Sequence, residues 1–138
     1  METQTAGPQA SSHEAQGRRT VHRVLALNSA MASVAGVVAL VGAAVMHLFL
    51  LPRMVDALVR YEIEVPGLTA VLIALPPLLH AGAAGLISTL LVVKEIALYR
   101  RPAVNLMTSV AVSLLAIGWL ALVALALYLP VRELAAIG

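Results

Sequence analysis

Long apolar segments alternate with short polar ones along this chain. The apolar segments cover about residues 26–51, 68–93 and 104–129. Each exceeds the roughly 20 residues that a helix needs to cross about 30 Å of hydrocarbon. A helix also satisfies its own backbone hydrogen bonds in lipid, where no water is present to do so. The pattern therefore predicts an all-α integral membrane protein, with three transmembrane helices in a membrane domain of residues 24–138.

The segment before the first span is polar and rich in small residues. Residues 1–23 contain few large apolar side chains and end in a basic group formed by Arg18, Arg19 and Arg23. Such a composition cannot bury enough surface to offset the entropy of ordering, so we expect a disordered tail. A cleaved signal peptide is the alternative, although the apolar segment that follows is too long for the core of one.

A short amphipathic segment follows the first span. Over residues 53–64, Met54, Leu58 and Tyr61 recur at helical spacing, and charged residues occupy the opposite side. This pattern is typical of a helix that lies in the membrane interface with its apolar side toward lipid.

Prolines mark the expected boundaries of these elements. Five of them are candidate structural breaks: Pro52, Pro66, Pro76, Pro77 and Pro130. We expect Pro52 to end the first span, Pro66 to precede the second and Pro130 to terminate the third. Pro76 and Pro77 lie inside the second apolar segment, where they remove two backbone donors and predict a kink. A membrane helix tolerates such a kink when neighbouring groups bind the freed carbonyls.

Small residues recur at helical spacing in two of the spans. The candidate helix-packing positions are Ala32, Gly36, Ala39, Ala43, Ala81, Gly82 and Gly85. Rows of small residues let another helix approach closely, so that dispersion contacts accumulate. Because the second span has both the kink and a small-residue row, we expect it to lie at the centre of the bundle.

Composition and charge agree with a membrane protein. The chain is 61% hydrophobic and 12% charged, and it contains no cysteine. Most of its basic residues flank the apolar segments, which indicates membrane orientation and not nucleic-acid binding. One side carries Arg18, Arg19, Arg23, Lys94, Arg100 and Arg101, and the other carries Arg53, Arg60 and Arg132. The excess predicts a cytoplasmic N-terminus and an external C-terminus.

Candidate chemistry within the spans is confined to His47 and His80. No Asp, Glu, Lys or Arg falls inside the predicted spans, so the parts of a proton relay or ion-coupled transporter are missing. We also find no catalytic constellation and no metal-ligand spacing, and expect no enzymatic activity. Counting along the helices places His47 about 6 Å deep and His80 about 18 Å deep. That difference argues against a bis-histidine haem within one chain, although either His could contact haem or another pigment.

Two short motifs resemble a known family. The chain leaves the first span at Leu51-Pro52-Arg53 and re-enters at Glu64-Val65-Pro66-Gly67-Leu68-Thr69, and its last span ends in Tyr128-Leu129-Pro130. These features resemble the transmembrane part of the type II secretion F family, the inner-membrane platform proteins of type II secretion and type IV pilus assembly. The resemblance covers roughly residues 40–93 and 115–135 and implies a membrane-only relative. The cytoplasmic helical domains of that family have no counterpart here.

Two function hypotheses follow. The first is a non-enzymatic scaffold in the bacterial inner membrane that binds no cofactor. Its partners would be the lipid bilayer and other membrane proteins or a second copy of itself, which it would contact through its small-residue rows. The alternative is an anchor or accessory subunit of a respiratory or photosynthetic complex, in which His80, and also His47, would contact haem or a pigment.

Overall fold

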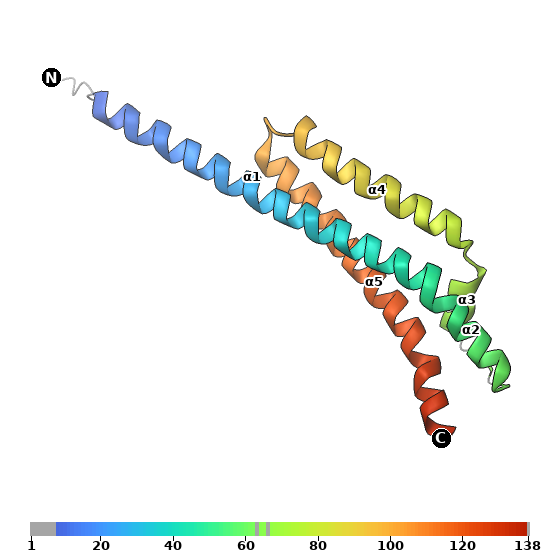
Figure 1. Ribbon diagram of the computed structural model, residues 1–138. Helices are drawn as coiled ribbons and strands as arrows, with labels where there is room; N and C mark the ends of the chain where they lie inside the picture. Colours follow the sequence, from blue (N-terminus) through green and yellow to red (C-terminus); the bar gives the residue numbers. More distant parts are fainter. Residues whose placement is uncertain (1–7, 63, 66, 138) are drawn as a thin grey trace.

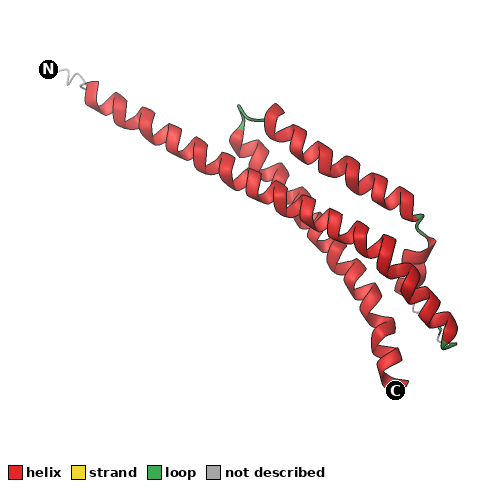
Figure 2. Cartoon of the chain, viewed as in Figure 1, coloured by secondary structure: helices red, strands yellow, loops and turns green. Residues whose placement is uncertain are grey.

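The structure is a computed structural model that describes residues 8–62, 64, 65 and 67–137, and every element within these residues is helical. The elements are α1 (Pro8–Val45), the π-helical turn η1 (Met46–Leu50), α2 (Leu51–Arg60), α3 (Gly67–Ala74), α4 (Pro77–Ala97) and α5 (Pro102–Ile137) (Figures 1 and 2). Three helical segments are long and apolar enough to cross a membrane: Ala15–Arg60, Pro77–Ala97 and Pro102–Arg132. The prediction of an all-α membrane protein with three spanning helices is confirmed.

Helix α1 begins well before the first apolar segment. Residues 8–23, which we expected to be disordered, are helical and continuous with the span, so that this end of α1 extends beyond the other helices (Figure 1). Residues 1–7 lie outside the described part. The local sequence accounts for the difference, because Pro8 suits the first position of a helix and the following Gln, Ala, Glu and Arg residues have good helix propensity.

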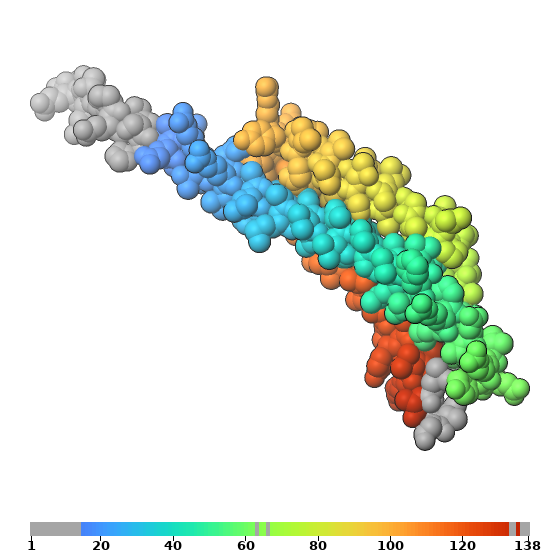
Figure 3. Space-filling view, viewed as in Figure 1, coloured from blue at the N-terminus to red at the C-terminus, as the bar shows by residue number. Residues whose placement is uncertain are grey.

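Helix α1 is also the centre of the bundle, a place that we had expected the second span to take. It packs along both α5 and α4, whereas α4 and α5 contact each other at few positions (Figures 1 and 3). The buried cluster that joins the three helices contains Ala39, Leu40, Ala84, Leu91 and Ala116. Small residues on all three helices therefore allow α1 to touch both neighbours.

The small-residue row of α1 explains its close approach to α5. A Cβ added at Gly36 would lie 2.6 Å from Ser113 Oγ and 3.3 Å from Ser113 Cα, which leaves no room for a methyl group. Ala39 and Ala43 on the same side are buried, and the backbone carbonyl of Ala32 accepts a hydrogen bond from the Ser113 hydroxyl. The contact thus combines close packing with a polar link, as is typical of membrane helices.

The small residues of α4 are placed differently. A Cβ added at Gly82 or Gly85 would have no other atom within 4 Å, and both glycines are exposed. Ala81 is half-buried. The residues of α4 that face α1 are instead His80, Ala84 and Leu91. Within the chain, Gly82 and Gly85 therefore do not contact another helix.

Pro52 does not break the first span, contrary to our expectation. The helix continues through η1 into α2, and the backbone N–H of Leu51 donates to the carbonyl of Met46, five residues earlier. The widened turn accommodates a proline in the first turn of α2 without ending the helix. Helix α2 ends at Arg60, before the predicted limit of residue 64, and Leu58 is its fully buried residue.

Pro130 does not end the last helix either, because α5 runs through it to Ile137. A proline lacks the N–H that would bond to the carbonyl four residues earlier, here that of Ala126. The Thr69 hydroxyl of α3 donates to this carbonyl at 2.7 Å. Because another helix supplies the missing donor, α5 can continue past the proline.

The second apolar segment forms two helices, with the break at Leu75–Pro76 that the two prolines predict. Helix α3 packs against the second half of α5. Its Leu72 belongs to a buried cluster with Ala43, Leu51, Val123, Ala126 and Leu127. Helix α4 extends past the predicted limit of residue 93 to Ala97. Pro66 lies outside the described residues.

Candidate functional site

Three ring side chains from three different helical segments meet inside the bundle. The ring centroids of His47 from η1 and His80 from α4 are 4.6 Å apart, and those of His80 and Trp119 from α5 are 5.5 Å apart. Both contacts are edge-to-face, with interplanar angles of 84° and 80°. His47 has no exposed surface, and His80 is 6% exposed. We name these three residues the histidine–tryptophan cluster.

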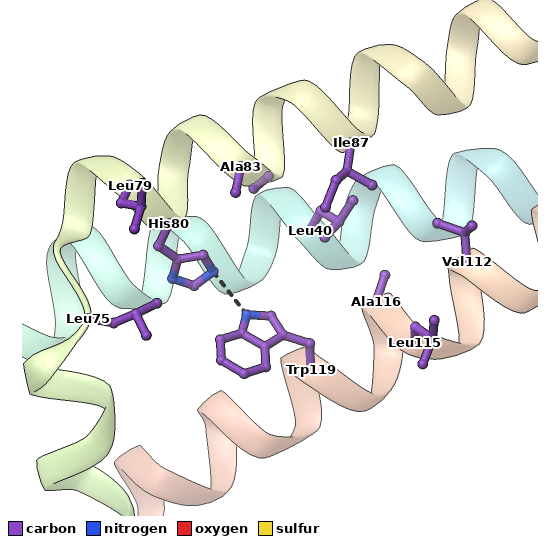
Figure 4. A pocket seen from close by; sticks show the side chains of 11 residues that line it. Leu40, Leu75, Leu79, His80, Ala83, Ile87, Val112, Leu115, Ala116 and Trp119 are labelled. Atoms are coloured by element: carbon purple, nitrogen blue, oxygen red, sulfur yellow. Dashed lines mark hydrogen bonds between the residues drawn. The ribbon is translucent and has the colours of Figure 1, made fainter.

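The hydrogen bonds of the cluster assign a neutral tautomer to each histidine. Trp119 Nε1–H donates to His80 Nε2 at 2.9 Å, so the proton of a neutral His80 is on Nδ1 (Figure 4). His47 Nε2 lies 3.1 Å from the carbonyl oxygen of Leu75, so His47 carries its proton on Nε2 and donates it. The two remaining Nδ1 atoms, one donor and one acceptor, are buried and have no partner. The protonated Nδ1 of His80 is the donor, and the unprotonated Nδ1 of His47 is the acceptor.

The depths that we counted for the two histidines were wrong, because the structure brings the imidazoles together. The count treated residues 68–93 as one helix that starts at the membrane edge. The break at Leu75–Pro76 instead makes α3 a separate helix, so His80 lies in the first turn of α4. The Leu75 carbonyl, which lies at the break, is bound by His47.

The geometry does not suit a bis-histidine haem. With metal–nitrogen bonds of about 2.0 Å, the centroids of two imidazoles on opposite sides of an iron are roughly 6 Å apart, with the porphyrin between them. The centroids of His47 and His80 are 4.6 Å apart and the rings meet edge to face. Both Nε2 atoms are already hydrogen-bonded. Among the described residues, no group of three or more His, Cys, Asp or Glu could hold a metal ion.

An apolar groove of about 420 Å³ runs from this cluster along the gap between α4 and α5. Leu79, His80, Ala83 and Ile87 line the α4 side. Val112, Leu115, Ala116 and Trp119 line the α5 side, and Leu40 of α1 forms the floor (Figure 4). The groove follows from the sparse contact between α4 and α5. We name it the α4–α5 groove.

A second polar cluster lies at the other end of α4, in the last turn of the helix. Lys94 and Glu95 belong to α4, and Lys94 Nζ and Glu95 Oε1 form an ion pair at 2.8 Å. Ser29 and Ser33 of α1 donate to the Glu95 carboxylate at 2.9 and 2.6 Å, and Asn105 Nδ2 donates to it at 2.7 Å. We name this group, together with Ser109, the lysine–glutamate cluster.

The lysine–glutamate cluster joins all three spanning segments. Lys94 Nζ also donates to Asn105 Oδ1 at 2.9 Å and to the Ser109 hydroxyl. The Ser29 and Ser109 hydroxyls are 2.7 Å apart. The charges balance and the donors and acceptors are paired, so the arrangement stabilises the contact between helices and leaves no group free for a ligand.

The sequence contained a signal for this cluster. Ser29 and Ser33 are four residues apart near the start of one span, and so are Asn105 and Ser109 in another. Polar residues with this spacing lie on one side of a helix. The Lys-Glu pair lies at the end of the span between these two. When the three spans are aligned by depth in the membrane, the two polar sides and the Lys-Glu pair fall at the same level, which predicts that they meet.

Comparison with known proteins adds no relative: no protein family, no curated protein and no solved structure matches the chain.

Proposed function

We propose that the protein is a non-enzymatic scaffold of a bacterial inner membrane, which packs against other membrane proteins or a second copy through the outward side of α4. The observation that carries the proposal is the open small-residue surface on that helix. Gly82 and Gly85 are one turn apart, and neither would meet another atom within 4 Å of an added Cβ. Thr89, one turn further, is exposed as well.

The outward side of α4 differs from an ordinary lipid-facing surface in shape. Exposed Leu, Ile and Val are expected on any spanning helix, and Leu78 and Ile96 are 85% and 80% exposed. Between these bulky residues, Gly82 and Gly85 leave a hollow in the helix surface. A hollow of this kind lets a second helix approach to short distance, and such contacts drive helix association in lipid.

The resemblance to the transmembrane part of the secretion and pilus platform proteins favours the same class of function. In that family the membrane part belongs to a larger assembly. The scaffold role proposed here accordingly includes the predicted orientation, with a cytoplasmic N-terminus and an external C-terminus. A reporter that is active only in the cytoplasm, fused to either end, tests this orientation, and activity at the C-terminus would contradict it.

The scaffold proposal is tested with Gly82→Leu and Gly85→Leu. Both substitutions should reduce chemical cross-linking between copies, or recovery of partner membrane proteins in mild detergent, because a leucine fills the hollow. Gly118→Leu is the matched control, since Gly118 of α5 also has open space around it. Unchanged association in both α4 variants, or an equal loss in the control, would refute the role of this surface.

A further inference from the structure

We propose that a shallow cleft between α1 and the start of α5 binds the head group of an anionic phospholipid. The cleft is lined by Gly17, Arg18, Val21, His22, Leu25 and Pro102, and we name it the α1–α5 cleft. The inference goes beyond the scaffold role, because its ligand is a lipid and its residues lie on α1 and α5, not on the outward side of α4.

The α1–α5 cleft lies at the level of the membrane surface. His22 precedes Ser29 by seven residues in α1, and Pro102 precedes Ser109 by seven residues in α5. The Ser29 and Ser109 hydroxyls are 2.7 Å apart. At 1.5 Å per residue, both cleft residues therefore lie about 10 Å beyond these hydroxyls, toward the N-terminal ends of the two helices. This level is also where the first and third apolar segments begin, so the cleft falls where hydrocarbon gives way to head groups.

The lining of the cleft changes from charged to apolar along one side of α1. Arg18, Val21, His22 and Leu25 are three or four residues apart, so they share a side of the helix. Arg18 is exposed, and Leu25, about 10 Å closer to the membrane core, is half-buried. A phospholipid has the same order, with its phosphate outermost and its hydrocarbon inward. A soluble phosphate compound would leave the apolar part of the cleft uncovered.

A ring contact holds the connection between α4 and α5 beside the cleft. The ring centroids of His22 and Tyr99 are 5.3 Å apart, with an interplanar angle of 69°. Arg100 and Arg101 follow Tyr99 directly, and both are exposed. The contact therefore places two further arginines next to Pro102, which borders the cleft.

The charge at this end of the molecule favours an anion. Residues 8–23 and 98–101 contain five arginines and one acidic residue, Glu14. The carboxylate of Glu95 in α4 is already paired with Lys94. Arginine binds phosphate oxygens through two parallel N–H donors, and basic residues at a membrane surface attract anionic lipids. An anionic phospholipid therefore matches the cleft in charge as well as in the order of its parts.

The test compares two phospholipids that have the same acyl chains. The full protein is purified in mild detergent, and native mass spectrometry measures how much phosphatidylglycerol and phosphatidylcholine it binds from an equimolar mixture. The protein should prefer phosphatidylglycerol. Arg18→Gln should lower this preference about fivefold, the effect of one basic residue near anionic lipid. An original protein without any preference would overturn the proposal.

Arg19→Gln is the matched control, because Arg19 is the next residue, is also exposed and does not line the cleft. It changes the net charge equally and should leave the preference unchanged. An equal effect of the two substitutions would refute the cleft as the site. Free glycerol phosphate, which carries a phosphate without acyl chains, should not displace the bound phosphatidylglycerol, and displacement would refute a lipid as the occupant.

Discussion

Replacing Thr69 by valine tests how α5 continues past a proline. The substitution keeps the shape of the side chain and removes the hydroxyl that donates to the Ala126 carbonyl at 2.7 Å. Thr69 has no exposed surface, so water cannot take its place. No backbone donor can replace it either, because residue 130 is a proline.

The expected magnitude follows from this lack of a substitute. Hydrogen bonds between membrane helices contribute about 0.6 kcal/mol on average and up to about 1.7 kcal/mol. Because the Ala126 carbonyl is left without any donor, we expect the upper end, about 1.5 kcal/mol of unfolding free energy. That corresponds to roughly a tenfold change in the unfolding equilibrium.

A double-mutant cycle with Pro130→Ala isolates the mechanism. An alanine at position 130 restores a backbone N–H that can donate to the Ala126 carbonyl, so Thr69→Val should then cost less than about 0.5 kcal/mol. Stability is measured by reversible unfolding in mixed micelles with increasing denaturing detergent, followed by Trp119 fluorescence. Thr108→Val is the control, because this exposed hydroxyl bonds within its own helix to the carbonyl of Val104. An equal cost of Thr69→Val in both backgrounds would refute the reasoning.

Three further predictions use the same unfolding assay. Gly36→Ala should destabilise the bundle by about 1–3 kcal/mol, because the new methyl group would overlap Ser113. Gly118→Ala, in open space, should not destabilise it, and equal effects of the two substitutions would contradict the α1–α5 contact. His80→Gln should lower the unfolding free energy by on the order of 1 kcal/mol, since the amide oxygen still accepts from Trp119. His80→Leu should lower it more and shift the Trp119 emission, and identical losses would show that this hydrogen bond is unimportant. Glu95→Ala should lower the unfolding free energy by about 2 kcal/mol, because it leaves the Lys94 ammonium without its carboxylate. Adding Lys94→Met should recover part of that loss, and no recovery would argue against the ion pair.

The sequence predicted the three spanning helices because their signal is local. Twenty or more consecutive apolar residues require a helix in lipid whatever their neighbours are. The break at Leu75–Pro76 is local as well, since two adjacent prolines remove donors from the same turn.

The predictions that Pro52 and Pro130 end their helices were wrong. A π-helical turn before Pro52 and a hydroxyl from α3 beside Pro130 let both helices continue. The hydroxyl comes from another helix, and no residue type in 46–50 marks that segment as a π-helical turn. The meeting of His47 and His80 was missed for a related reason, because counting depth along one segment ignores how the other segments are displaced.

The α4–α5 groove follows from the way the helices are held together. Lipid chains are as apolar as leucine, so association between the helices depends on close packing and on polar contacts. The polar contacts lie at two levels, the lysine–glutamate cluster at one end of α4 and the bonds of His47 and His80 at the other.

Between these two levels, α4 and α5 are each packed on α1 and are scarcely in contact with each other. Ala83 and Ala84 on α4 and Ala116 on α5 line the intervening space, and their side chains are too short to close it. An empty gap of this size would forfeit the dispersion contacts of its whole lining. In a membrane, apolar surroundings restore those contacts, so the three-helix arrangement is stabilised in part from outside the chain.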